Sequence, residues 1–291
     1  MKLNADNKKQ IDRLLSLRKD FKIKSLSIDV DISDISALML TELWPEAVDG
    51  NLIVKTDEEK FYRASSIINV MIQGSLKTKK FLDFGCGEGH CAIAAAREEA
   101  IVVGYDQTVH DWMILGEIPD DCSFTTDVEF VEENGPYDII LMYDVMDHIV
   151  EIDECKKALN LIKSVMHDHG TAYVRCHPLT SRHANHVYET LNKAYAHLFV
   201  TDDELIKMGH DPQPVANIIR PLATYEVLFK EAGFKIESID IVKEPVEDFF
   251  FDVDMSEIIR KRLSNSIFDA TKEWQQYVLP IQFIDYQLRK L

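Results

Sequence analysis

Three glycines at alternate positions, Gly85, Gly87 and Gly89, directly follow the apolar run 81–84. Glycine lets the backbone turn sharply and approach a ligand closely, and a helix that starts after such a turn offers free N–H groups to the ligand. Seventeen residues after Gly89, Asp106 follows the β-rich run IVVGY. A carboxylate at that place can accept hydrogen bonds from ribose hydroxyls. The pattern therefore predicts a binding site for an adenosine cofactor.

The spacing of these glycines argues against a nicotinamide dinucleotide. The dinucleotide fingerprint is G-x-G-x-x-G, but His90 stands where its third glycine belongs, and Gly89 comes one residue early. An oxidoreductase that binds NAD is therefore a disfavoured alternative to a protein that binds another adenosine cofactor. Measurements of cofactor binding would distinguish the two.

A second group of reactive side chains lies in segment 176–186, which holds three histidines, an arginine and two hydroxyl residues. Histidine accepts protons near neutral pH, and arginine pairs with carboxylates or phosphates. We therefore expect this segment to bind a substrate, the acceptor of a transferred group, through His177 and Arg182. The histidines expected to remove a proton from that acceptor are His148, His183 and His186.

Two other interpretations of this segment stay open. His183 and His186 are three residues apart, as on one helix face, which suits a metal ion. His177, with Asp144 or Asp147 across a cleft, would complete such a site. Alternatively, these polar groups satisfy one another and cap the helix that follows. We prefer the acceptor-binding interpretation and predict no metal.

Alternation of short β-rich runs with longer helical patterns predicts that both groups lie on a parallel sheet. The predicted strands are 80–84, 101–105, 123–126, 137–143, 171–176, 235–242 and 280–291. The fold class is therefore α/β, with a doubly wound, mostly parallel sheet of seven strands.

Helical patterns occupy most of the intervals between these strands. The predicted helices are 89–98, 109–116, 151–167, a continuous helix from near 184 to 199, and 224–233. Gly170 and Gly233 are the expected stops of the third and last of them, because glycine readily ends a helix.

Two regions lie outside the alternation. Residues 1–60 carry an amphipathic pattern and are predicted to form an N-terminal helical extension, and residues 61–291 to form the domain with the sheet. A helical insertion is predicted at about 177–222, after the fifth strand. We expect the extension and the insertion to cover the acceptor pocket. Shortly before the glycines, Arg63 either pairs with a cofactor carboxylate or lies in solvent.

The stretch Asp83-x-Gly85-x-Gly87-x-Gly89 resembles motif I of the class I S-adenosylmethionine-dependent methyltransferases. Asp106 matches the ribose-binding acid of that family, and residues 137–149 look like its fourth strand and the tail that follows. The similarity covers about residues 60 to 243. In the family, the acid equivalent to Asp83 reaches the amino group of the cofactor, usually through water.

The resemblance implies the class I fold and S-adenosylmethionine as the cofactor. The cofactor-binding residues that it implies are Asp83, Gly85, Cys86, Gly87, Asp106, Gln107, Asp127, Val128 and Tyr143. Asp127 with Val128 matches the adenine-binding position, although an acid after a strand is often a helix N-cap instead. Cys86 is expected to make a packing contact rather than to act as a reactive thiol.

Composition excludes several other classes of protein. The chain has 291 residues, of which 46% are hydrophobic and 28% charged, as in a folded globular protein. Its formal net charge of −18 repels phosphate backbones, so nucleic acid is a disfavoured partner. Five cysteines without a C-x-x-C pair argue against a disulfide framework, and no signal peptide or membrane span is recognisable. We expect a cytoplasmic protein.

The sequence therefore predicts an S-adenosylmethionine-dependent methyltransferase that acts on a small-molecule acceptor, at oxygen or nitrogen. After the fourth strand the chain reads Tyr143-Asp144-Val145-Met146, where amino-methylating enzymes of DNA show an Asn-Pro-Pro-Tyr-like run. Base methylation by that route is disfavoured. The alternatives are a catalytically silent partner subunit that binds the cofactor, and a methyltransferase of proteins or nucleic acids.

Overall fold

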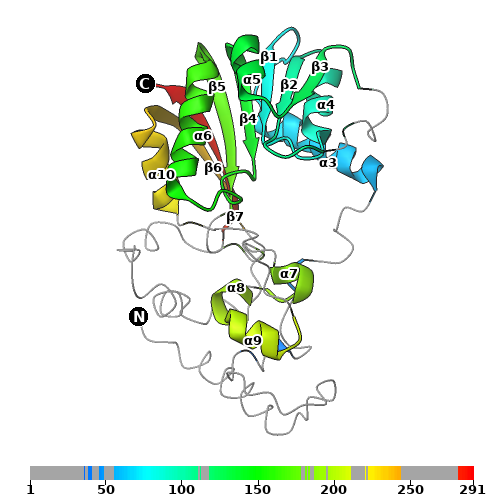
Figure 1. Cartoon of the computed structure of the whole chain (residues 1–291), viewed down its shortest axis with the longest axis vertical. Helices are drawn as coiled ribbons and strands as arrows, with labels where there is room; N and C mark the ends of the chain where they lie inside the picture. Colours follow the sequence, from blue (N-terminus) through cyan, green and yellow to red (C-terminus); the bar gives the residue numbers. More distant parts are fainter. Residues whose placement is uncertain are drawn as a thin grey trace, which may run out of the picture. The chain divides into compact units, whose positions relative to one another are not determined.

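The structure is a computed structural model, and Figure 1 shows the whole chain. It describes residues 36, 39–40, 46–48, 56–110, 112, 118–177, 181, 183, 187–194, 196–210, 220, 222–243 and 281–291. The chain divides into two compact units. One unit consists of Ile53–His177, Leu222–Ile241 and Phe283–Leu291, and the other of Met1–Leu52, Pro178–Pro221 and Val242–Gln282.

The first unit is built on a single seven-stranded sheet with the strand order β3-β2-β1-β4-β5-β7-β6 (Figure 1). Its strands are β1 (Lys80–Phe84), β2 (Ile101–Tyr105), β3 (Cys122–Thr125), β4 (Tyr137–Tyr143), β5 (Met166–Cys176), β6 (Phe234–Lys243) and β7 (Ile281–Lys290). Strands β1 to β5 pair in parallel, whereas β7 runs antiparallel to β5. The prediction of a seven-stranded, mostly parallel sheet is confirmed.

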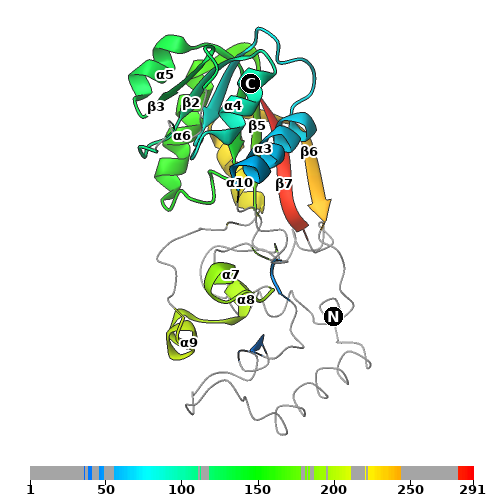
Figure 2. The same cartoon turned by 90° about the vertical axis from the view of Figure 1, so that its right-hand side faces the viewer.

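Helices cover both faces of this sheet (Figure 2). On one face lie α3 (Asp57–Met71) and α4 (His90–Arg97), and on the other lie α5 (Val128–Asn134), α6 (Ile152–Val165) and α10 (Leu222–Glu231). Four alanines of α4 are buried, and such small side chains let the helix lie close to the sheet. Phe81 and Leu82 are fully buried because successive strand residues point to opposite, covered faces.

The helix α3 begins with a capping box that the sequence shows as Thr-Asp-Glu-Glu. The side chain of Thr56 accepts a hydrogen bond from the N–H of Glu59, and the Glu59 carboxylate accepts one from the N–H of Thr56. These two bonds satisfy backbone donors that a helix start leaves unpaired. The same device begins α9 (Asp202–Lys207) in the second unit, at Thr201 and Glu204.

The predicted helix 151–167 with a stop at Gly170 is wrong at its end. Helix α6 ends at Val165, and Gly170 lies inside β5. A Cβ atom on Gly170 would lie 2.8 Å from the carbonyl oxygen of Tyr137. Gly170 therefore permits the close approach of β5 to the start of β4 and does not end a helix.

In the described part of the second unit lie the short helices α7 (Val187–Thr190), α8 (Ala196–Phe199) and α9. The predicted continuous helix up to residue 199 is wrong, because the chain leaves helical structure between α7 and α8. There the Asn192 side chain pairs with the backbone of Val48, donating to its carbonyl at 2.8 Å and accepting from its N–H at 2.9 Å. Part of the N-terminal region and part of the insertion thus lie in one unit.

Two other predicted features fall largely outside the described residues. Of the predicted helix 109–116, the structure describes residues 109, 110 and 112, and the amphipathic pattern before residue 36 is not described at all. Within the described part of the chain, no helix combines the length and the apolar character that a membrane crossing requires.

Candidate functional site

The carboxyl ends of the parallel strands bring the chemically interesting residues to one edge of the sheet. Phe84 pairs with Tyr105 at the ends of β1 and β2, and Tyr143 pairs with Arg175 near the ends of β4 and β5. The loops that follow these strands therefore lie at the same edge, which is where open α/β sheets bind ligands. The loops after β1 and β4 are in contact, because a Cβ atom on Gly85 would lie 2.5 Å from Cγ2 of Val145.

The glycine turn after β1 leaves open space beside its backbone. Gly85, Gly87 and Gly89 have φ angles of +75°, +50° and +88°, which residues other than glycine rarely adopt. The N–H groups of Gly85 and Cys86 donate to the carbonyl of Tyr105 at 2.7 Å and 2.9 Å. A Cβ atom on Gly87 would meet no atom within 4 Å. The turn is thus fixed to β2 and still has room for a ligand at Gly87.

Asp83, at the end of β1, has an unsatisfied oxygen below this turn. Its side chain is buried, and its Oδ2 atom has no hydrogen-bond partner. Burial raises the pKa of the carboxyl group to about 7, the backbone N–H of Ala92 lowers it, and the charge of Asp106 raises it further. A buried acceptor without a partner is unfavourable, so this oxygen suits a donor group of a bound molecule.

Asp106 connects the tip of β2 to the glycine turn. Its Oδ2 accepts a hydrogen bond from the N–H of Gly87 and its Oδ1 one from the N–H of Thr108, both at 2.9 Å. Each carboxylate oxygen can accept a further bond. The carboxylate is therefore anchored to the backbone and retains capacity for the ribose hydroxyls that the sequence predicts there.

Trp112 is a residue near the turn that sequence reasoning missed. Its indole Nε1 donates to the carbonyl of Gly87 at 2.8 Å, and its ring stacks on Phe124 with 5.0 Å between centroids. A Cβ atom on Gly89 would lie 2.6 Å from the Phe124 ring, so the glycine admits that ring. Trp112 lies 23 residues after Gly89 in the chain, so no local pattern in the sequence signals this contact.

Asp127 has a local role in the structure. Oδ1 of Asp127 accepts a hydrogen bond from the N–H of Glu129 at 2.9 Å and so caps α5. Gln107 and Val128 are exposed, and the predicted contacts of these three residues with the cofactor stay predictions. Burial raises the pKa of the Cys86 thiol, which favours the packing role expected for it.

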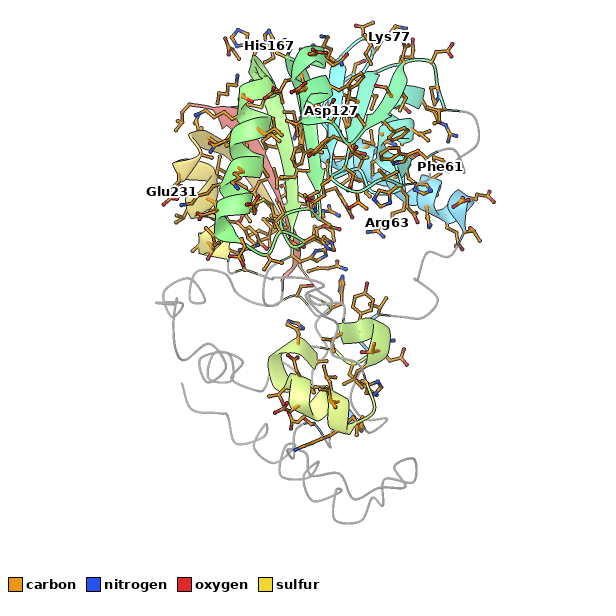
Figure 3. The ribbon with its side chains drawn as sticks, in the orientation of Figure 1. Phe61, Arg63, Lys77, Asp127, His167 and Glu231 are labelled. Carbon is orange, nitrogen blue, oxygen red and sulfur yellow. The ribbon has the colours of Figure 1, made fainter. Side chains whose placement is uncertain are left out.

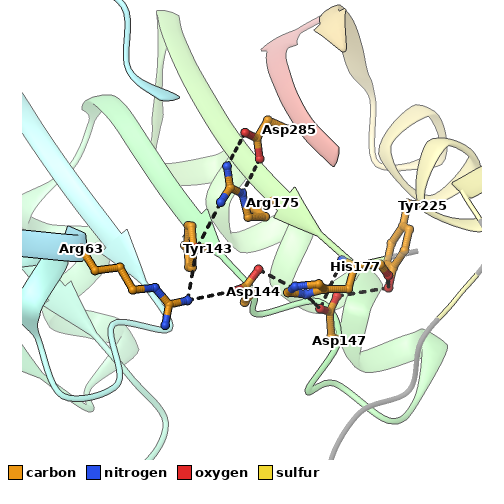
Figure 4. A network of polar contacts seen from close by, with 8 residues as sticks. All are labelled: Arg63, Tyr143, Asp144, Asp147, Arg175, His177, Tyr225 and Asp285. Atoms are coloured by element: carbon orange, nitrogen blue, oxygen red, sulfur yellow. Dashed lines mark hydrogen bonds and ion pairs between the residues drawn. The ribbon is translucent and has the colours of Figure 1, made fainter. Parts of the chain in front are cut away.

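Three ionisable side chains converge beyond β4 and β5 (Figure 4). Nδ1 of His177 lies 2.8 Å from Oδ2 of Asp147 and 3.4 Å from Oδ1 of Asp144. Asp147 is fully buried and also accepts hydrogen bonds from the hydroxyl of Tyr225 at 3.2 Å and the backbone N–H of His177 at 3.3 Å. We call Asp144, Asp147 and His177 the Asp–Asp–His cluster.

The charges in this cluster act strongly on one another. Burial by itself would lower the pKa of His177, but the charge of Asp144 and the hydrogen bond and charge of Asp147 raise it to about 9. Burial raises the pKa of Asp144, and the nearby charge of His177 opposes that shift. Both shifts come from the closeness of the three side chains, and the two carboxylates favour a positive charge at His177.

A chain of polar contacts runs from this cluster to the neighbouring strands (Figure 4). Arg175 donates to both carboxylate oxygens of Asp285, at 2.6 Å and 2.5 Å, and to the hydroxyl of Tyr143 at 3.1 Å. Arg63 donates to the same hydroxyl at 3.3 Å and lies 4.0 Å from Oδ2 of Asp144. Figure 3 shows Arg63 on α3, where its side chain is 55% exposed. A ligand at this edge can therefore reach Arg63.

The histidines predicted to remove a proton are placed as follows. His148 is exposed in the loop after β4, where its N–H donates to the carbonyl of Val145 at 2.9 Å. His183 belongs to the second unit, where its ring lies 5.9 Å from that of Tyr188. His186 and the predicted acceptor-binding residue Arg182 lie outside the described residues. Their roles stay predictions.

A comparison with protein families finds a match over more than half of the chain. The model of a family described as a methyltransferase domain matches residues 56–239. No curated protein sequence matches the chain.

Among solved structures, the chain is similar to a SAM-dependent methyltransferase from Archaeoglobus fulgidus, at 15% identity over 79% of this chain and 94% of that one, with a TM-score of 0.49. It is also similar to magnesium protoporphyrin IX methyltransferase from Synechocystis PCC 6803, at 16% identity over 84% and 90% of the two chains, with a TM-score of 0.47. A third is 1,6-didemethyltoxoflavin-N1-methyltransferase from Burkholderia thailandensis, at 13% identity over 80% and 79%, with a TM-score of 0.46.

Proposed function

The chain belongs to the methyltransferase family whose model matches residues 56–239, and on that premise we propose that it methylates a small-molecule acceptor at oxygen or nitrogen. Its sheet order, with β7 antiparallel to β5, is the class I methyltransferase fold. S-adenosylmethionine is the methyl donor, and when bound it supplies a methyl group on a positively charged sulfur atom.

The observation that carries the proposal is the contact between two loops at one sheet edge. The glycine turn after β1 has open space at Gly87, and the loop that follows β4 packs on it through Val145. Methyl transfer requires the acceptor atom in line with the bond between sulfur and the methyl carbon. A donor at the glycine turn and an acceptor next to Asp144 would be neighbours.

The residues on the β1 and β2 side bind the donor in this proposal. Asp106 accepts hydrogen bonds from the ribose hydroxyls, while its existing bond to the N–H of Gly87 holds the turn in place. The unpartnered Oδ2 of Asp83 accepts a hydrogen bond from the amino group, through water or directly. Arg63 pairs with the carboxylate end of the donor or of the acceptor.

The residues on the β4 and β5 side bind the acceptor. Bound S-adenosylmethionine would supply the methyl group and leave as S-adenosylhomocysteine, and a base on the protein would have to take the proton of the acceptor. His177, which directly follows β5, keeps its predicted role as a contact of the acceptor. His148, His183 and His186 keep the role of candidate base, and Arg182 that of an acceptor contact.

Charge favours a small acceptor over nucleic acid. The formal net charge of −18 opposes association with a phosphate backbone. A catalytically silent partner subunit would bind the donor equally well, so binding alone does not distinguish it from an enzyme.

Calorimetry with S-adenosylhomocysteine and with NAD tests the donor site. We expect S-adenosylhomocysteine to bind and NAD not to bind. Asp106→Ala should weaken the binding by about 30-fold to 1,000-fold, since about 2 to 4 kcal/mol of charge-assisted hydrogen bonding is lost. The matched control Asp120→Ala removes an exposed carboxylate before β3 and should leave the affinity unchanged. Equal affinity in both variants would refute the donor site.

An acceptor screen tests the reaction itself. The release of S-adenosylhomocysteine is followed in a coupled assay with panels of small hydroxyl, phenol and amine compounds, and with RNA and protein fractions as competing classes. Turnover with a small molecule supports the proposal. Turnover only with a macromolecular fraction, or donor binding without turnover in any panel, contradicts it.

A further inference from the structure

We propose that the Asp–Asp–His cluster is a binding site for one divalent transition-metal ion such as Mn²⁺. Asp144 directly follows β4, Asp147 lies three residues later, and His177 directly follows β5. The two strands are parallel neighbours, so their carboxyl ends bring the three side chains together from two separate loops. Among the described residues, these three side chains lie close enough together to hold one ion.

The separations between the donor atoms fit a common ion. Nδ1 of His177 is 2.8 Å from a carboxylate oxygen of Asp147 and 3.4 Å from one of Asp144, and all three donor atoms lie within 4.8 Å of one another. Ligands about 2.1 Å from an octahedral ion lie about 3 Å apart when adjacent and about 4.2 Å apart when opposite. The three donor atoms are thus spaced much as around one ion, which would take the place of the proton on Nδ1 of His177.

One ligand atom of the cluster has no hydrogen-bond partner. Oδ1 of Asp144 is buried and accepts no hydrogen bond, and its contact with His177 at 3.4 Å is longer than that of Asp147 with the same nitrogen. Asp144 also has φ at +56°, an unfavourable angle for a residue other than glycine. A buried carboxylate oxygen that faces a second carboxylate and an imidazole suits a cation.

A second layer of contacts orients the ligands. The buried hydroxyl of Tyr225 on α10 donates to Oδ1 of Asp147 at 3.2 Å, which leaves Oδ2 facing His177. Arg63 lies 4.0 Å from the other oxygen of Asp144, Oδ2, and Arg175 is paired with Asp285. Such outer contacts are typical of metal sites, where they fix the ligand orientation.

The ligand set selects the kind of ion. Ca²⁺ takes six to eight oxygen ligands, and Mg²⁺ keeps several waters and prefers oxygen. Two carboxylates with one imidazole suit Mn²⁺, Fe²⁺, Co²⁺ or Zn²⁺, because imidazole favours transition metals and carboxylate favours harder ions. Mn²⁺ accepts both donor types and is therefore the ion that we test.

The use of this site, but not its existence, rests on the proposed function. Three protein ligands would leave positions open on an octahedral ion, and the acceptor is proposed to lie at the same edge of the sheet. An acceptor with two neighbouring oxygen atoms would fill two of them. The site would thereby select oxygen chelators among the small molecules and hold one oxygen close to the methyl donor.

Calorimetric titration of the chelator-treated full-length protein with MnCl₂ tests the site. We expect one Mn²⁺ per chain, and at least about tenfold weaker binding in Asp144→Asn and in His177→Gln. The matched control carries Asp168→Asn with His169→Gln, the same residue types exposed at the start of β5. This control also removes one member of the surface pair His167 and His169, whose rings are 5.7 Å apart, and should bind Mn²⁺ as the wild type does.

Several outcomes overturn the proposal. The proposal is wrong if the wild type binds no Mn²⁺, if both cluster variants bind Mn²⁺ as tightly as the wild type, or if the control variant loses Mn²⁺ binding instead. Pulsed paramagnetic resonance of the Mn²⁺-loaded wild type adds a test that needs no variant. It should detect coupling to an imidazole nitrogen, and its absence refutes the site even if the variants fold poorly.

Titration of the same proteins with S-adenosylhomocysteine separates this inference from the proposed function. If the wild type binds Mn²⁺ but not S-adenosylhomocysteine, the proposed function fails and the metal site stands. If it binds S-adenosylhomocysteine but not Mn²⁺, the metal site fails alone. The cluster variants should retain S-adenosylhomocysteine affinity within about threefold, which also reports that they fold.

Discussion

The two halves of the sheet's carboxyl edge are built in different ways. On the β1 and β2 side, backbone conformation makes the site, with glycines at positive φ and an aspartate that accepts hydrogen bonds from nearby N–H groups. On the β4 and β5 side, side chains far apart in sequence make it, since Arg175 and Asp285 are 110 positions apart and Asp147 and His177 are 30 apart. The first half depends on the conformations that the backbone can adopt. The second half depends on charges that only the folded sheet brings together.

The largest effect that this contrast predicts is on stability, from Arg175→Met. The guanidinium is 7% exposed, pairs with Asp285 across the antiparallel β5 and β7, and lies 3.5 Å from the ring centroid of Phe283. Removing it leaves the Asp285 carboxylate buried without a partner. We expect the free energy of unfolding, measured in urea, to fall by about 3 to 5 kcal/mol.

Two further variants show whether burial causes this loss. Lys77→Met breaks an ion pair of 2.6 Å with Glu99 in which both side chains are more than 60% exposed, and should change the free energy of unfolding by less than about 1 kcal/mol. Arg175→Met combined with Asp285→Leu removes both charges and should regain most of the stability. Equal losses for Arg175→Met and Lys77→Met would contradict the contrast.

The second-largest effect concerns the β1 and β2 side of the sheet edge, where Gly87→Val should abolish binding of S-adenosylhomocysteine. Gly87 has φ at +50° and open space where a Cβ would lie, so valine would both strain the turn and fill that space. We expect at least about a 100-fold loss of affinity by calorimetry, or about 2.7 kcal/mol.

Gly74→Val is the control that separates strain from blocking. Gly74 also has positive φ, at +93°, and open space around it, but it lies in the loop after α3. Both variants should lose similar stability, whereas Gly74→Val should keep the affinity for S-adenosylhomocysteine. Normal binding by folded Gly87→Val would mean that the turn serves only the packing of the sheet.

The same contrast explains how much the sequence predicts. The seven strands, the glycine turn and the place of Asp106 at the tip of β2 follow from local patterns, because each depends on neighbouring residues alone. The predicted end of helix 151–167 failed where tertiary structure decides, since Gly170 serves the pairing of β5 with β4. The helix expected up to 199 failed because Asn192 hydrogen-bonds to distant Val48.

The acceptor half could be predicted only in part, for the same reason. The sequence suggested a metal site at His183 and His186, which lie close together in the chain, with His177 and one of Asp144 or Asp147 completing it. The adjacency of β4 and β5 instead brings His177 to Asp147 and Asp144. No periodicity in the sequence predicts the pairing of Arg175 with Asp285 or of Tyr225 with Asp147.

The smallest predicted effect concerns Asp83 and the pH dependence of donor binding. Burial raises the pKa of this carboxyl group to about 7 in the ligand-free protein, with a further contribution from Asp106. A positively charged amino group of S-adenosylhomocysteine near Oδ2 favours the ionised carboxylate, so the pKa is lower in the complex. Binding below pH 7 must then release a proton. The affinity should therefore fall as the pH decreases through 7, by about tenfold between pH 8 and pH 6.

Two comparisons assign this pH dependence to Asp83 and to the amino group. Asp83→Asn has no proton to release, so calorimetry should give it nearly the same affinity at pH 6 and pH 8. Methylthioadenosine contains the adenosine and sulfur but lacks the amino acid part, so its affinity for the wild type should also be flat. A tenfold pH effect that persists in Asp83→Asn would place the titrating group elsewhere. If methylthioadenosine shows the effect as well, Asp83 interacts with the adenosine part, and the unpartnered Oδ2 does not face the amino group.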